Sequence, residues 1–347
     1  MVENRRNLEK VWTAVDLYCG SGAVSQGLKQ VGFKVLAAVD NDPVACKTYR
    51  MNHPEVNLAE GDIRSLKAAD VCQNKSIDLL VVCAPCQPFS SQNRLRGSDD
   101  PRSDLVLECI KFVEQLTPNV VFFENVPGIA LSGVSKKLST KLSEYGYYLG
   151  EPRTLNAAHY NVPQRRVRSI MVASKSRELT EQFYASLKPS SKVTVRDAIS
   201  GLRSLAAGQK DPKDKLHFAR NHSEIALKRL SYIEKDGGSR FSIPYELQLN
   251  CHKDTKAYPD VYGRMKWDDV APTLTTGCTD ITRGRFAHPE DDRAISLREA
   301  ALLQTFPREY SFYGNSGQIA RQIGNAVPVN MICRMASSIM DCLSSSK

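Results

Sequence analysis

The feature that most constrains the fold is a series of short apolar runs that alternate with helix-like stretches through the first half of the chain. The apolar runs cover residues 12–18, 34–40, 78–84, 119–125 and, later, 168–174. Helical patterns lie between them near residues 23–31, 43–52, 103–116 and 134–145. Apolar strands that alternate with helices are typical of βαβ units, in which helices cover both faces of the sheet. The sequence therefore predicts an α/β fold with a mostly parallel sheet.

The pattern changes after about residue 185. Residues 186–290 are polar and rich in turn-forming residues, so we expect a smaller inserted domain made of short strands and loops. Helical order returns over residues 296–306, where Ser296 and Glu299 have the spacing of a capping box. We expect a final helix to begin near residue 328.

Composition narrows the class of protein. No apolar run approaches the roughly 18 residues of a membrane span, and the first twelve residues lack the apolar segment of a secretion signal. We therefore expect a cytoplasmic protein with no membrane contact, reduced cysteines, and no metal site, because the single CxxC unit has no second unit at zinc spacing. The net charge of +9 favours a polyanionic partner.

A glycine turn follows the first predicted strand, in the segment "DLYCGSGAVSQGL" at residues 16–28. Asp40 comes twenty residues after Gly20, at the end of the next strand, where an acid can accept hydrogen bonds from ribose hydroxyls. Asp62 lies at a third strand end and could accept one from an adenine amino group. Ser25 replaces the third glycine of the dinucleotide fingerprint, which disfavours NAD. A nucleoside cofactor is the favoured interpretation, and simple packing of a strand against a helix is the alternative.

Cys86 lies between Pro85 and Pro88, just beyond the strand at residues 78–84. Thioredoxin-like CxxC motifs open a helix, and this one does not. The two prolines would stiffen the backbone and hold one thiol in a cleft, which suits a nucleophile. A packing cysteine, or a redox pair with Cys83, is the alternative.

A carboxylate and a basic cluster lie at later strand ends. Glu124 follows four apolar residues, where an acid is costly unless it has a role, and it could act as a proton donor. Three arginines in "QRRVRS", residues 164–169, precede a strand and could grip a phosphate or a base carbonyl. The alternatives are an ordinary turn acid and a solvated basic face.

Taken together, these motifs resemble those of the bacterial DNA (cytosine-5)-methyltransferases of restriction-modification systems. The matching segments stand in the order of that family: "DLYCGSGAVSQGL", "VDND", "GDI", "APCQPFS", "ENVPG", "QRRVR", "ISLREAALLQTFP" and "QIGNAVPVN". The resemblance implies a Rossmann-like, S-adenosylmethionine-dependent methyltransferase fold. It also implies a discontinuous catalytic domain, residues 1–185 plus 318–347, and a target-recognition domain with its hinge at residues 186–317.

The resemblance also implies a mechanism. Cys86 attacks C6 of a cytosine that has been flipped out of the duplex, while Glu124 supplies a proton or hydrogen bond at N3. S-adenosyl-L-methionine gives its methyl group to C5 and leaves as S-adenosyl-L-homocysteine, and loss of the C5 proton expels the cysteine. Arg168 and Arg166 would hold the base at O2 and a nearby phosphate, and Asn125 would fix the proline-bearing loop.

The residues implied for the cofactor are Tyr18, Gly20, Ser21, Gly22, Ala23, Asp40, Asn41, Asp62, Ile63, Pro85, Leu105, Asn325 and Ala326. Two of them depart from the family pattern, which usually has a second glycine at Ala23 and often an aromatic residue at Asn41. Both departures could lower the affinity for the cofactor.

The expected partner is double-stranded DNA, with a cognate restriction endonuclease as a functional rather than physical partner, and we expect a monomer. The residues implied for DNA binding are Gln92, Arg94, Arg96, Arg165, Thr273, Arg283 and Arg285. We expect the loop at residues 89–104 to close over the DNA. Candidates for contacts to guanine are Arg220, Arg240, Arg264, Arg283 and Arg285.

Three other functions are compatible with parts of the sequence. An RNA cytosine-5 methyltransferase of the same fold would use the same Cys86 and Glu124, but residues 186–290 offer a surface suited to reading a DNA groove. A catalytically inactive DNA-binding homologue would not need a reactive thiol. A thiol oxidoreductase using Cys83 and Cys86 would not need the cofactor motifs.

Overall fold

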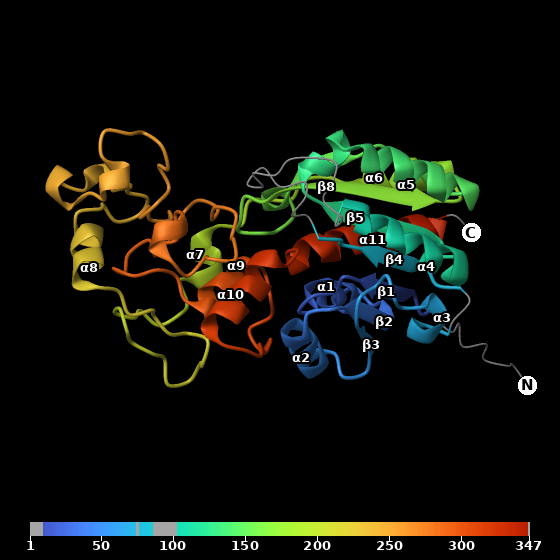
Figure 1. Ribbon diagram of the computed structural model, residues 1–347, viewed down its shortest axis with the longest axis horizontal. Coiled ribbons are helices and arrows are strands. Elements are labelled where there is room, and N and C mark those ends of the chain that lie inside the picture. The colour runs from blue at the N-terminus through green and yellow to red at the C-terminus, as the bar shows by residue number, and fades with distance from the viewer. Residues whose placement is uncertain (1–9, 74–75, 86–102, 346–347) are drawn as a thin grey trace, which may run out of the picture.

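The computed structural model describes residues 10–73, 76–85 and 103–345. Within these residues, eight strands form one sheet in the order β3-β2-β1-β4-β5-β8-β6, and β7 also pairs with β8 (Figure 1). The strands are β1 (Thr13–Leu17), β2 (Lys34–Asp40), β3 (Asn57–Glu60), β4 (Leu79–Val82), β5 (Val120–Asn125), β6 (Tyr148–Leu149), β7 (Arg153–Asn156) and β8 (Val167–Ser174). Strands β1 to β5 are parallel, whereas β8 is antiparallel to β5. The predicted α/β fold is confirmed.

Helices cover both faces of the sheet because successive side chains of each strand point to opposite sides. In β4, Leu79 and Val81 pack into one hydrophobic cluster, and Leu80 and Val82 pack into another. The first cluster is closed by α1 (Ala23–Gln30), α6 (Arg177–Ser186) and α11 (Val329–Ser345). The second is closed by α3 (Ala68–Val71), α4 (Ile110–Leu116) and α5 (Gly133–Glu144). Helix α2 (Pro43–Asn52) follows β2.

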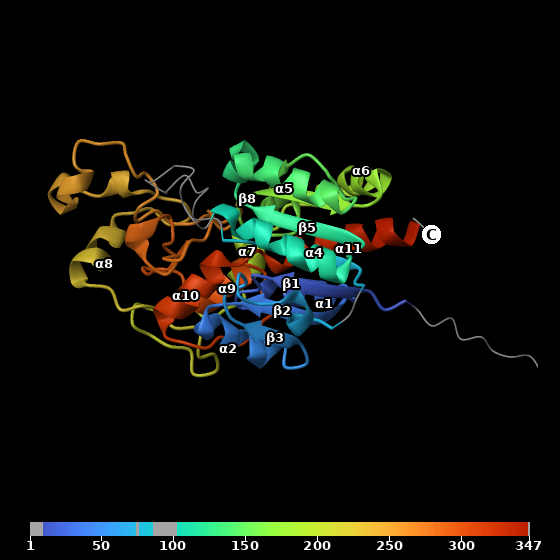
Figure 2. The same cartoon turned by 45° about the vertical axis from the view of Figure 1, so that its right-hand side comes forward.

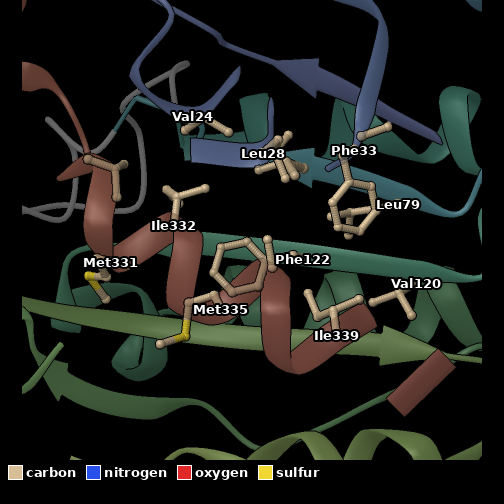
Figure 3. Close-up of a cluster of buried hydrophobic side chains, with 14 of the residues drawn as sticks. Val24, Leu28, Phe33, Leu79, Val120, Phe122, Met331, Ile332, Met335 and Ile339 are labelled. Carbon is tan, nitrogen blue, oxygen red and sulfur yellow. The ribbon is translucent and has the colours of Figure 1, made fainter. Parts of the chain in front are cut away.

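The C-terminal helix α11 packs against the N-terminal half of the sheet domain. Its Ile332, Met335 and Ile339 face the cluster that includes Leu28 of α1 and Phe122 of β5 (Figure 3). The last helix of the chain therefore belongs to the same core as the first strand. None of the helices formed by the described residues has the length and apolar character that a membrane crossing requires.

Residues 186–317 lie to one side of the sheet in both ribbon views (Figure 1, Figure 2). Their helices are α7 (Val195–Ile199), α8 (Glu224–Ser231), α9 (Leu297–Leu303) and the start of α10 (Ser316–Asn325). The expectation of short strands here is wrong, because the structure gives residues 186–317 only isolated β-bridges, short helices and loops. The predicted capping box is confirmed, since Ser296 accepts from the backbone of Glu299 and Glu299 accepts from that of Ser296.

Several element boundaries differ from the sequence-based ones. The helix expected over residues 103–116 is a 3-10 helix (Ser103–Cys109) followed by α4. The strand end expected at Asp62 corresponds to β3, whereas the short strands β6 and β7 and helices α6 and α10 were not predicted from the sequence. The short strands hold only two to four residues each, too few for a periodic pattern to be recognised.

Candidate active site and nucleic-acid cleft

A cleft of about 2120 Å³ opens at the carboxyl edge of the parallel strands. Its sheet side is formed by the ends of β1, β2, β4 and β5, the start of β8 and the end of α10. Its other side is formed by residues 258–261, 272–276 and 283–286. Asp40 and Glu124, two of the strand-end residues singled out from the sequence, therefore face the inserted region across one cleft, as ligand sites in open α/β sheets do.

A carboxylate–arginine pair borders this cleft. Glu124 lies one residue before the end of β5, Arg168 is the second residue of β8, and their side chains are 8% and 13% exposed. Arg168 Nε lies 2.9 Å from Glu124 Oε1, yet this oxygen makes no hydrogen bond within the described residues. Arg168 also donates from Nη1 to the carbonyl of Val167 at 2.8 Å. Both residues border the cleft, while Glu124 Oε1 itself is buried beside Arg168.

Asn125 joins the ends of the two central strands. Its Nδ2 donates to the carbonyl of Ala84 at 3.1 Å, and its Oδ1 accepts from the amide of Val126 at 2.9 Å. Ala84 and Pro85 border the cleft and lead into Cys86, which lies outside the described residues, as do Gln92, Arg94 and Arg96. The amide of Asn125 therefore fixes the backbone immediately before the predicted nucleophile.

Cys83, the alternative thiol, follows β4 directly. Burial, with the nearby charge of Glu124, raises the pKa of its thiol well above the ordinary range. A thiol that stays protonated is a poor nucleophile and a poor redox partner. This position argues against the thiol oxidoreductase interpretation.

The glycine turn after β1 is tied to the end of β2. The amide of Gly20 donates to Asp40 Oδ2 at 2.8 Å, and Asp40 Oδ1 accepts from the amide of Asp42 at 2.9 Å. Burial raises the pKa of Asp40 despite these backbone donors. A Cβ atom added to Gly20 would meet no atom within 4 Å, so the turn faces open space in the cleft.

The other predicted cofactor residues fall into two groups. Those that border the cleft are Tyr18, Gly20, Ser21, Ala23, Asp40, Asn41, Pro85, Asn325 and Ala326. Those that do not are Gly22, Asp62, Ile63 and Leu105. Asp62 is held by Arg64, with Arg64 Nε and Oδ1 3.0 Å apart, and Ile63 is buried in the sheet core. Leu105 contributes its carbonyl, which accepts from the Tyr18 hydroxyl at 2.5 Å.

Arg166 is buried at the boundary between the two parts of the protein. Its Nη1 donates to the carbonyl of Leu274 and its Nη2 to that of Gly324, both at 3.1 Å. Two of its donors are thus used to hold the inserted region and α10 together. The role expected for it, gripping the base and a phosphate, has to compete with these contacts.

The residues predicted for DNA binding that the structure describes lie on the cleft. Arg165 and Thr273 are exposed on facing segments, and the Thr273 hydroxyl donates to the carbonyl of Arg165 at 2.6 Å. Arg283 is exposed, with its side chain 67% accessible, and Arg285 is more enclosed, at 25%. Arg285 donates to Asp260 and to the backbone of the opposing loop.

Two of the five candidates for guanine contacts are wrong. Arg240 and Arg264 are 2% and 0% exposed, and their guanidinium groups donate to backbone carbonyls of the inserted region. Neither guanidinium group reaches the protein surface, where a base could contact it. Arg220 remains exposed and pairs with Asp280 at 3.0 Å.

A buried pair of amides was missed by the sequence analysis. Gln164 and Gln304 are both 0% exposed, and Gln164 Nε2 donates to Gln304 Oε1 at 2.9 Å. Gln164 also accepts from the amide of Leu274, and Gln304 donates to the carbonyl of Ile323 at 2.6 Å. The pair links the segment before β8, the inserted region and α10. The available signal was Gln304, a single amide in the apolar run that α9 begins.

The comparisons with known proteins agree with this geometry. The sequence matches the C-5 cytosine-specific DNA methylase family over residues 12–341. It is 38% identical over 343 residues to the Type II methylase M.HgiDII of Herpetosiphon aurantiacus, covering 95% of each chain. It is 32% identical to the Type II methyltransferase M.Eco47II of Escherichia coli, covering 96% of this chain and 80% of that one.

Solved structures share the fold at lower identity. The Dnmt2 methyltransferase of S. pombe superposes with a TM-score of 0.64 and 18% identity, covering 96% of this chain and 99% of that one. A prophage-encoded protein of Escherichia coli superposes with a TM-score of 0.74 and 23% identity, again covering 96% and 99%. From the matched family and the Type II relatives, we conclude that the chain belongs to the C-5 cytosine-specific DNA methylases and is a DNA cytosine-5 methyltransferase.

Proposed function

We propose that the enzyme methylates C5 of a flipped-out cytosine in double-stranded DNA, with S-adenosyl-L-methionine as methyl donor and Cys86 as nucleophile. The observation that carries the proposal is the convergence on one cleft of the Glu124–Arg168 pair, the Asn125 clamp and the open glycine turn. In this proposal the Glu124–Arg168 pair receives the base and the glycine turn receives the cofactor, both in the same cleft.

The residues around the glycine turn fit S-adenosylmethionine. The space above Gly20 admits a ligand, Asp40 offers carboxylate oxygens at the end of β2, and Asn41 and Asn325 are exposed polar groups on the same cleft. When bound, S-adenosylmethionine supplies an electrophilic methyl group.

On the base side, the thiolate of Cys86 adds to C6 while Glu124 supplies a proton or hydrogen bond at N3, so that electron density moves to C5. After methylation, the C5 proton passes to water, N3 gives back the proton that it received, the C5–C6 double bond re-forms and the sulfur leaves as thiolate. Arg168 orients Glu124 and offers a donor toward O2. A duplex buries C5 and C6 in the base stack, so the cytosine must be extruded first.

The decisive experiment is bisulfite sequencing of DNA from a methylation-free host that expresses the protein. We expect protected cytosines within one short sequence motif, and no protection with Cys86→Ala, although this variant should still bind DNA. Protection that persisted in Cys86→Ala would refute the nucleophile. Absence of protection with soluble wild-type protein would refute DNA as the substrate.

A second variant tests the acid. Glu124→Gln removes the carboxylate but keeps its shape, and we expect methylation to slow about 10²- to 10⁴-fold, the usual contribution of a positioned acid. Glu60→Gln is the control, because Glu60 pairs with Arg50 on the surface at 2.7 Å and lies outside the cleft. Equal activities of the two variants would exclude a role for Glu124 in the chemistry.

A further inference from the structure

Two buried side chains lie directly behind the glycine turn. Tyr310 is 3% exposed, and its hydroxyl donates to the carbonyl of Ser21 at 2.6 Å. His53 is 1% exposed, and its Nε2 lies 3.1 Å from the carbonyl of Gly22 and 3.1 Å from the Tyr310 hydroxyl. Two successive carbonyls of the turn are therefore held by side chains from other parts of the chain.

The neighbours of His53 fix which nitrogen carries the proton. Lys29 Nζ lies 3.2 Å from Nδ1, and a lysine ammonium can only donate, so Nδ1 accepts and Nε2 bears the hydrogen. That hydrogen points toward the Gly22 carbonyl and the Tyr310 oxygen. Burial, together with the charge of Lys29, lowers the pKa of His53 to about 4, so the ring is neutral at neutral pH.

The turn has no freedom to move back from these side chains. Gly22 has φ 94°, and a Cβ atom added to it would lie 2.6 Å from His53 Nε2 and 2.7 Å from the Tyr310 hydroxyl. Gly20, two residues earlier, faces open space in the cleft instead. One side of the turn is thus pressed against Tyr310 and His53, and the other side is presented to a ligand.

Tyr310 belongs to the segment that follows α9, and this segment is fastened to α2. The amide of Ser311 donates to Asn52 Oδ1 at 3.0 Å, and Asn52 Nδ2 donates back to the carbonyl of Ser311 at 2.9 Å. The amide of Tyr313 donates to Thr48 Oγ1 at 2.9 Å. Tyr310 also shares a hydrophobic cluster with Ala23, the first residue of α1.

We propose that Tyr310, together with His53, is a positioning residue for the cofactor turn, through which the segment after α9 sets the affinity for S-adenosylmethionine. The inference rests on the proposed function, because it assumes that the glycine turn holds the cofactor. It goes further by assigning the rigidity of that turn to two residues that do not border the cleft.

The test is Tyr310→Phe with Tyr147→Phe as its matched control. Tyr147 is also 3% exposed, and its hydroxyl also donates to a backbone carbonyl, that of Pro118, at 2.6 Å. Both variants lose the buried hydrogen bond that the hydroxyl donates to a carbonyl, and Tyr310→Phe also loses the contact with His53 Nε2, so both should lose stability of the same order. Only Tyr310→Phe should weaken cofactor binding, by about three- to tenfold for the loss of one such bond.

The measurements are the Kd for S-adenosyl-L-homocysteine by calorimetry, KM for S-adenosylmethionine, kcat, and the Kd for DNA. For Tyr310→Phe we expect a raised Kd and KM, with kcat and DNA affinity close to those of the wild type. Equal cofactor affinities of Tyr310→Phe and Tyr147→Phe would overturn the inference.

A second variant approaches the turn from the other carbonyl. His53→Gln keeps a donor near the carbonyl of Gly22, so we expect a smaller loss of cofactor affinity than with His53→Ala. Equal losses would mean that the hydrogen bond is irrelevant and would count against the inference. A wild-type protein that bound neither S-adenosylmethionine nor S-adenosyl-L-homocysteine would instead refute the proposed function, and that result is visible without any variant.

Discussion

The sheet domain and the inserted region provide hydrogen-bond partners for their buried backbone groups in different ways. In the sheet domain, strands pair with strands, and the side chains packed between sheet and helices are aliphatic and aromatic. In residues 186–317, regular ladders are absent from the structure, and the largest fully buried side chains of the described chain are three arginines of this part: Arg240, Arg264 and Arg293. Each guanidinium donates to backbone carbonyls that no strand partner serves.

The comparison teaches what a region without regular structure requires. Buried carbonyls need donors wherever they lie, and one arginine carries five donors in a fixed fork. Arg240 alone binds the carbonyls of His252, Thr255, Ala257 and Tyr258. Buried arginines in this region therefore take the structural role that strand partners take in the sheet domain.

The largest change in stability is expected for a substitution of Arg293. This residue is 0% exposed and pairs with Glu299, itself 1% exposed, at 2.8 Å. Arg293→Met would leave the Glu299 carboxylate buried without its cation, and we expect a loss of about 3–5 kcal/mol in the free energy of unfolding. Urea denaturation measures it.

The control for this prediction is Arg196→Met. Arg196 makes a two-pronged pair with Asp268 in the same region, but both side chains are exposed, at 48% and 72%. Exposed pairs contribute little, so this variant should unfold close to the wild type. Similar losses in both variants would show that burial of the arginine is not what matters.

The next effect contrasts buried carboxyl groups. Glu299 has its arginine, whereas Asp16 in β1 is 0% exposed and its Oδ1 has no hydrogen-bond partner among the described residues. Burial raises the pKa of Asp16 to about 7, despite the hydrogen bond from Ser25. A raised pKa in the folded state means that stability is complete below the unfolded value near 3.8 and is lost as pH rises through about 7.

Asp16→Asn should therefore gain stability relative to the wild type as pH rises from 5 to 8, with a slope of at most about 1.4 kcal/mol per pH unit. The stability of the wild type is subtracted from that of the variant at each pH, because other groups also titrate. Burial lowers the pKa of His53 and of His288 to about 4, so these two residues make the protein more stable as pH rises toward 6.5. Asp78→Asn is the control, since the pKa of Asp78 is lowered and it stays ionised throughout. Parallel pH profiles for both variants would contradict the prediction.

A smaller effect is expected for Arg240. Arg240→Met removes the hydrogen-bond donors of four carbonyls within residues 252–258. Some of these carbonyls should then bind water instead, and we expect the free energy of unfolding to fall by about 1–3 kcal/mol. Amide hydrogen exchange should quicken over this segment and not in the sheet. Arg220→Met, an exposed arginine paired with Asp280, should leave exchange unchanged. Protection that stayed constant in Arg240→Met would disprove the role given to this residue.

The buried and exposed positions of these arginines show how much of the fold and of the site could be predicted from the sequence. The sheet was predictable because apolar strands that alternate with helices are typical of a parallel sheet covered by helices on both faces. The strand-end positions of Glu124 and Asp40 followed from that arrangement. Arg240 and Arg264 were misassigned because an arginine that caps carbonyls looks the same in a sequence as one that reaches a base. Gln304 and Tyr310 could not be assigned, since their partners lie far along the chain.

The smallest effect on stability, and the one that completes the contrast, belongs to Arg283. Its side chain is 67% exposed on the cleft and lies 3.9 Å from Asp280, so its removal leaves no buried group unpaired. Arg283→Ala should unfold like the wild type but bind DNA more weakly, and the slope of log affinity against log salt should fall by about 1 if it contacts a phosphate. Arg177→Ala, exposed on α6 beside Glu181 and away from the cleft, should change neither quantity. Substitution of a buried arginine in this region would then lower the free energy of unfolding, whereas substitution of an exposed one would reduce the salt dependence of DNA binding. An Arg283→Ala variant that was less stable than the wild type but kept its salt slope would contradict this distinction.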